Sequence, residues 1–257
     1  MTTPGIEPGR DLREARIDAA GMHYRDLNAG IRELVGEGYT GITLDGVNGQ
    51  RYIGDGIVSP VRIIVNGVPG NDLGAFMDGP TIVVNDNAQD GVGNTMNGGK
   101  IVISGHAGDV LGYGMRGGRI FIGGDVGYRV GIHMKSYKEQ VPVIMAGGRA
   151  GDFFGEYMAG GILVLLGLGH EGSPVLGQYV GTGMHGGTIY VRGRLGDGQL
   201  GEEVRVFDIE EEDRLFIGEL LGEFSLDLGL DLDGVGADDF IKLRPFSNRP
   251  YGNMYVY

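Results

Sequence analysis

The chain has 257 residues, no cysteine and a net charge of −13 at neutral pH. Without cysteine it can form no disulfide, thiolate metal site, cysteine-held iron–sulfur cluster or cysteine nucleophile. It contains 53 glycines but only 9 prolines, which excludes collagen. The negative charge and the lack of a basic stripe predict no nucleic-acid partner.

Residues 1–40 are predicted to form an N-terminal strand and a capping helix. Leu27, Ile31 and Leu34 follow helical spacing, and glycines follow them. The first ten residues lack the apolar core of a signal peptide, and the longest nearly apolar run is about half of the ~20 residues that span a membrane. We therefore expect a cytoplasmic protein with no membrane partner.

Residues 41–201 contain a repeat of 19 residues that predicts a parallel β-helix. Met77, Met96, Met115 and Met134 are each 19 residues apart, and the repeat continues after two insertions, near residues 135–140 and 169–174. A unit this short cannot hold a strand and a crossover helix. We expect about seven coils of short strands, with a methionine column at a corner or inside.

Apolar residues keep the same register and predict a column that points into the core. In a strand such as Ile120-Phe121-Ile122, the first and third side chains share one face. The corresponding residues of the other coils should stack on them. The column comprises Ile63, Ile82, Ile101, Ile120, Ile144, Leu163 and Ile189.

Glycines repeat in the pattern G-x-x-G-x-x-x-G, and we interpret them as corner residues that adopt positive φ. Two stretches, residues 112–117 and 181–186, also match the dinucleotide fingerprint G-x-G-x-x-G. That fingerprint requires a following helix, whereas another repeat follows here. The Gly-Asp pairs at 108–109, 124–125 and 151–152 resemble calcium-binding β-rolls, but those need a nine-residue period.

The sequence offers no catalytic, cofactor-binding or metal-binding residues. Five histidines show no ligand spacing, although we expect two of them, His133 and His185, near each other on the coil surface. The polar insertion at residues 135–140 is either a docking loop or a tolerated surface loop. The five histidines are His23, His106, His133, His170 and His185.

Residues 202–257 are expected to form an acidic helix, a short strand and an extended tail, so that helical caps close both ends of the coils. Residues 202–240 hold fourteen acidic residues against two basic ones. The apolar residues of 209–224 suggest the helix, and residues 240–243 the strand. The acidic stretch is interpreted as a solvated face, with an electrostatic docking surface as the alternative.

The chain resembles the third domain of the glutamate synthase large subunit in its stand-alone form. The resemblance rests on the glycine repeat and on three flanking segments: IDA at 17–19, NGQRYIG at 48–54 and RPYG at 249–252. It covers nearly the whole chain. The same β-helix occurs in one of the subunits of formylmethanofuran dehydrogenase and in the related formyltransferase/hydrolase, but the segment at 48–54 and the tail favour glutamate synthase.

The resemblance implies a right-handed β-helix without an active site of its own, in a glutamate synthase-type oxidoreductase of ammonia assimilation. It implies a glutamine amidotransferase subunit and a synthase subunit with FMN and an iron–sulfur cluster as partners, with an NAD(P)H or ferredoxin reductase subunit as a further candidate. The alternatives are a scaffold in a formylmethanofuran-type complex and an autonomous β-helix enzyme.

Overall fold

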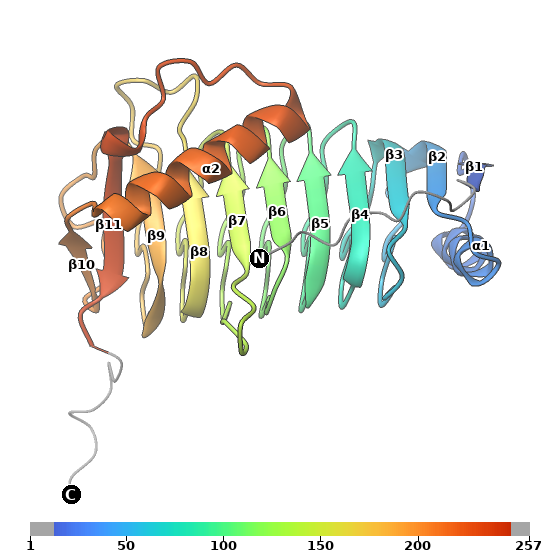
Figure 1. The fold of residues 1–257 in the computed structure, drawn as a ribbon, viewed down its shortest axis with the longest axis horizontal. Coiled ribbons are helices and arrows are strands. Elements are labelled where there is room, and N and C mark those ends of the chain that lie inside the picture. Colours follow the sequence, from blue (N-terminus) through green and yellow to red (C-terminus); the bar gives the residue numbers. More distant parts are fainter. Residues whose placement is uncertain (1–12, 248–257) are drawn as a thin grey trace, which may run out of the picture.

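The chain forms a parallel β-solenoid in which the strands of successive turns lie side by side in one sheet (Figure 1). Figure 1 is a computed structural model that describes residues 13–247, so the expected tail at 248–257 lies outside the described residues. The predicted right-handed parallel β-helix is confirmed, with about six turns instead of seven.

The sheet has the strand order β1-β2-β3-β4-β5-β6-β7-β8-β9-β11-β10. Its strands are β1 (Glu14–Asp18), β2 (Gly41–Asn48), β3 (Arg62–Val68), β4 (Asp78–Val84), β5 (Gly98–Ile103), β6 (Arg119–Ile122), β7 (Val143–Ala146), β8 (Ala159–Leu165), β9 (Gly186–Arg192), β10 (Val204–Phe207) and β11 (Phe240–Pro245). The helices are α1 (Tyr24–Gly36), α2 (Glu211–Leu228) and the short 3-10 helix η1 (Ala237–Asp239).

The isoleucine column lies in the predicted register and fills the core. Strand pairing places Ile101 beside Ile82 on one side and Ile120 on the other, and all three are fully buried. The repeat methionines, such as Met115, are also fully buried, so their column lies inside. Because burying one such side chain stabilises by about 1.5–3 kcal/mol, the columns supply much of the stability that holds neighbouring turns together.

Each turn contains a zigzag of residues with positive φ, two positions apart. Val110, Gly112 and Gly114 have φ of 62°, 63° and 58°. The N–H of Val110 donates to the next turn at Tyr128, whereas the N–H of Gly112 donates back to the preceding turn. The middle position faces the core, where a Cβ on Gly112 would overlap Cδ1 of Ile144. This explains one glycine of every repeat.

Side-chain acceptors that bridge the turns explain the other repeat glycines and the Gly-Asp pairs. The carboxylate of Asp109 accepts the N–H of Tyr128 at 2.8 Å, and the carboxylate of Asp125 accepts that of Arg149 at 2.8 Å. A Cβ on Gly127 would overlap the Asp109 carboxylate. The residue of the next turn that faces each acceptor must therefore be small. Further acceptors of this kind are Asn87, Asp90, His106 and Asp152.

The helix α1 covers the N-terminal end of the solenoid, as predicted. It lies beside β1 and β2 in Figure 1, and Leu27 and Ile31 are buried in the same core as the isoleucine column. His23 caps it by accepting the N–H of Arg25 at 3.4 Å. Since β1 pairs in parallel with β2, the N-terminal strand extends the same sheet.

The second helix differs from the expected position, because α2 lies across the outer face of β5 to β9 and not over the C-terminal end (Figure 1). The outward residues of these strands are apolar: Phe121 and Val164 are buried beneath α2, and Phe224 meets Phe121 edge-on at 5.4 Å. The far end is instead closed by β11, which pairs antiparallel with β9 and with β10.

The acidic segment is only partly a solvated face. On α2, Glu223 forms ion pairs with Lys100 and Arg119, and Asp227 pairs with Lys100. These contacts join α2 to the outer face of β5 and β6. The charge of this segment therefore also holds the helix on the sheet.

Candidate functional site

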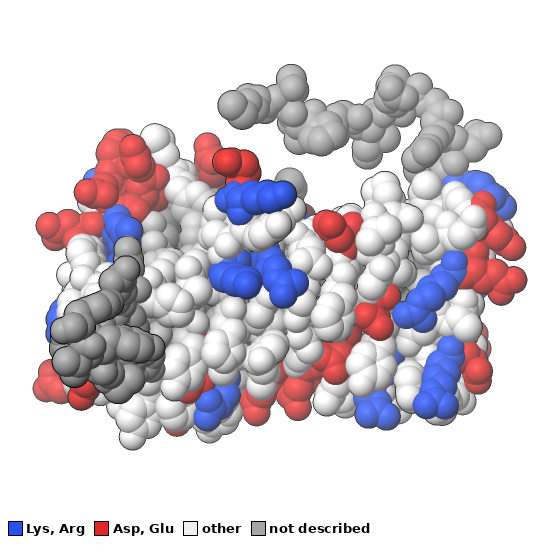
Figure 2. All heavy atoms as spheres, turned by 90° about the horizontal axis from the view of Figure 1, so that it is seen from below, with Lys and Arg blue, Asp and Glu red and all other residues white. Residues whose placement is uncertain are grey.

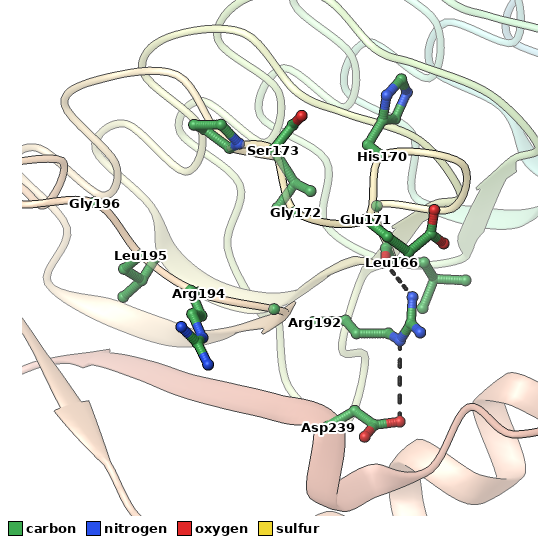
Figure 3. Close-up of a pocket in the computed structure, with 14 residues that line it drawn as sticks. Leu166, His170, Glu171, Gly172, Ser173, Arg192, Arg194, Leu195, Gly196 and Asp239 are labelled. Atoms are coloured by element: carbon green, nitrogen blue, oxygen red, sulfur yellow. Dashed lines mark hydrogen bonds and ion pairs between the residues drawn. The ribbon is translucent and has the colours of Figure 1, made fainter.

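A cavity of about 550 Å³ lies beside the end of β9 and is the main candidate for a small-molecule site (Figure 3). Its walls come from three separate segments: residues 166–175, residues 192–196 and Asp239 at the end of η1. The first segment includes the predicted insertion at 169–174. That insertion therefore helps to build a concave feature.

The cavity contains opposite charges that partly cancel. Arg192 donates to the carbonyl of Leu166 at 3.3 Å, and its Nε lies 3.9 Å from Asp239 (Figure 3). Arg194 forms no ion pair or hydrogen bond with any residue that the structure describes. Glu171 also lines the cavity, and backbone N–H donors, its own first and then that of Gly169, hold the pKa of its carboxyl below the ordinary value.

His170 and Ser173 lie in this wall, but they do not form a nucleophile–base pair. His170 Nε2 lies 3.2 Å from the carboxylate of Asp125. Burial tends to raise the pKa of Asp125, but the Arg149 N–H and His170 together hold it below the ordinary value. Within the described residues no hydrogen bond joins the Ser173 hydroxyl to the His170 ring, and such a bond is what nucleophile activation needs.

The other histidines serve local contacts. His106 accepts the N–H of Asp125 at 2.8 Å. His133 stacks on Tyr157 at 5.3 Å between ring centroids, and Nδ1 of His185 lies 3.3 Å from the carbonyl of Gly183. We expected His133 and His185 near each other, but their rings form no contact with one another. Across residues 13–247, no group of three or more histidine, aspartate or glutamate side chains could hold a metal ion.

The two G-x-G-x-x-G stretches form corners of the solenoid. In residues 112–117 the first and third residues are the positive-φ glycines of one zigzag, and β6 follows at Arg119. In residues 181–186 the match leads directly into β9. A dinucleotide site needs a helix whose N-terminus faces the phosphates. Here each stretch leads into a strand.

A buried polar network beneath α2 could not be foreseen from the sequence. The Tyr190 hydroxyl donates to Asp213 at 2.5 Å, and Lys242 pairs with Asp213 at 2.7 Å. Burial and then the Asp213 hydrogen bond raise the pKa of Tyr190 far above its usual value. Burial alone would raise the pKa of Asp213 and lower that of Lys242, but the hydrogen bond between them reverses both shifts.

This network stabilises the helix on the sheet. Its three groups come from β9, α2 and β11, and each is at least nine-tenths buried. No local signal in the sequence connects residues that lie so far apart along the chain. A buried charge pair with its hydrogen bonds satisfied favours one docking position of α2 over sliding alternatives.

None of the helices in the described part of the chain is long and apolar enough to cross a membrane. The predicted insertion at residues 135–140 forms a small exposed hairpin, closed by an antiparallel bridge between Tyr137 and Gln140. It projects from the corner at which the strands begin.

Comparison with known proteins places the repeat in a family. The family model for the GXGXG motif matches residues 37–216. A relative from Methanocaldococcus jannaschii, "Uncharacterized protein MJ1350", is 47% identical over 256 residues, which cover 96% of this chain and 98% of the relative. With the solenoid and its repeat glycines, these matches show that the chain belongs to the GXGXG motif family, the family of the third domain of the glutamate synthase large subunit.

Proposed function

We propose that this chain is a non-catalytic scaffold subunit of a glutamate synthase-type complex. In this role it holds a glutamine amidotransferase subunit and an FMN- and iron–sulfur-containing synthase subunit in fixed positions. The observation that supports the proposal most directly is family membership combined with the absence of cysteine. A chain without cysteine supplies neither the thiol nucleophile of such an amidotransferase nor the thiolate ligands of a cluster.

The use of the polar residues supports the same proposal. The repeat aspartates accept backbone N–H groups of the next turn, and the buried Tyr190–Asp213–Lys242 network joins α2 to the sheet. These groups stabilise a stiff rod, and stiffness is the property that a scaffold needs. A stack of turns with buried columns transmits position over its whole length because protein interiors are close-packed.

Purification of the tagged full chain from its native host, followed by mass spectrometry, tests the proposal. We expect co-elution with an amidotransferase-like protein and an FMN-containing protein. Formation of glutamate from glutamine and 2-oxoglutarate should depend on the presence of this chain in the reconstituted mixture. Recovery of the chain alone, or with formylmethanofuran-type subunits, would contradict the proposal, as would turnover by the isolated chain.

A further inference from the structure

One corner of the solenoid carries basic side chains in an otherwise acidic protein. Figure 2 looks onto the face at which the strands begin and shows basic side chains gathered near its middle. The Lys135 N–H donates to the Met115 carbonyl at 3.0 Å, which stacks Lys135 on the neighbouring Arg116. Lys138 projects from the adjoining hairpin. The three cations come from two successive turns, so the fold brings them together.

Within residues 13–247 these cations have no acidic partner. Among the described residues, no ion pair engages Arg116, Lys135 or Lys138. The ammonium of Lys138 lies over the ring of Tyr137, at 5.2 Å from its centroid. Glu139 in the same hairpin offsets one charge and leaves the corner basic. By contrast, Lys100 and Arg119 on the sheet are paired with α2.

Exposed aromatic side chains lie close to these three cations in the chain. Tyr113 is 42% exposed and Tyr137 is 52% exposed. His133 packs edge-on against Tyr113 at 5.7 Å, and its N–H bonds to the next turn. Tyrosine and arginine are the residue types enriched at the energetic centres of protein interfaces. We call the surface formed by Tyr113, Arg116, His133, Lys135, Tyr137 and Lys138 the basic corner.

We propose that the basic corner is the docking surface for an acidic segment of another subunit of the complex; this inference rests on the proposed function. Charge complementarity identifies the partner, since unpaired cations beside exposed aromatics favour a polypeptide with carboxylates over an apolar one. A second copy of this chain fits less well because each copy carries a net charge of −13. Nucleic acid fits less well because its binding needs a continuous basic track.

Titration of each purified partner subunit, the amidotransferase and the FMN-containing one, into the full chain tests this surface. We compare the wild type with the triple variant Arg116→Glu/Lys135→Glu/Lys138→Glu. The matched control, Arg25→Glu/Arg62→Glu/Arg244→Glu, has the same change in net charge at other exposed positions. We expect the corner variant to weaken binding of one subunit by roughly 30-fold, with little change in the control, and wild-type affinity to fall as salt rises.

Each other outcome overturns the inference in a distinguishable way. If neither subunit binds the wild type, the proposed function fails and this inference fails with it. If the wild type binds and the corner variant binds equally well, or if the control loses as much affinity, only the assignment of the surface is overturned. Self-association in sedimentation that only the corner variant abolishes would assign the surface to a second copy. Charge-dependent binding of a 20-nucleotide RNA would assign it to nucleic acid.

Discussion

Replacing Gly112 with alanine separates two reasons for which a solenoid corner requires glycine. Gly112 and Gly114 belong to the same zigzag and have nearly the same φ, 63° and 58°. A Cβ on Gly112 would overlap Cδ1 of Ile144, whereas a Cβ on Gly114 would have its nearest neighbour, Thr95 Oγ1, at an ordinary 3.7 Å. The two substitutions thus share the backbone strain, and they differ in steric overlap with the core.

The left-handed conformation costs an alanine about 1–2 kcal/mol, and the loss of freedom in the unfolded chain offsets about 0.4–1 kcal/mol of this. Overpacking a core adds about 1–3 kcal/mol. We therefore expect Gly114→Ala to destabilise by about 1 kcal/mol and Gly112→Ala by about 2–4 kcal/mol. At this chain length these costs correspond to thermal midpoints lowered by roughly 3 °C and roughly 10 °C.

Circular dichroism melts of the two variants, with Gly112→Ala/Ile144→Val as a third, provide the measurement. The valine removes Cδ1 and should recover most of the steric part, so the double variant should be more stable than the sum of the single effects predicts. Equal midpoints for the two alanine variants would refute the reasoning, as would the lack of any rescue by Ile144→Val.

Three further variants test the contacts that hold the fold. Phe224→Ala removes a fully buried ring from the α2–sheet contact and should cost about 3–5 kcal/mol, seen as faster proteolytic release of the C-terminal segment. Asp213→Asn leaves Lys242 with Glu210, at 3.3 Å, as its remaining carboxylate partner and should cost about 1–3 kcal/mol at pH 7. Because the folded-state pKa of Asp213 is lowered, its contribution is present above the unfolded value of about 3.9 and is lost as pH falls below it, so the melting difference between wild type and Asp213→Asn should shrink toward pH 3. Asp109→Ala removes the acceptor of the Tyr128 N–H and should cost about 1 kcal/mol in a urea titration; an unchanged midpoint would show that solvent replaces this hydrogen bond.

The repeat in the sequence determined most of the solenoid. A period of 19 residues with Ile101 and Ile120 in register leaves one way to bury both, which is to stack parallel strands. The insertions could also be located, because they interrupt a strict period. Local spacing likewise indicated both helices, since apolar residues on one helical face need a surface to cover.

Only the tertiary structure decided where those pieces meet. The sequence places Glu223 and Lys100 more than a hundred residues apart, and their ion pair exists because α2 turns back along the sheet. Tyr190 meets Asp213 because α2 lies on the sheet, and Arg192 meets Asp239 because the chain returns to pair β11 with β9. Periodicity specifies which residues of successive turns stack on one another, because each turn repeats the path of the one before it. Contacts between the solenoid and the segment that follows it depend on the path of the chain, which no local pattern encodes.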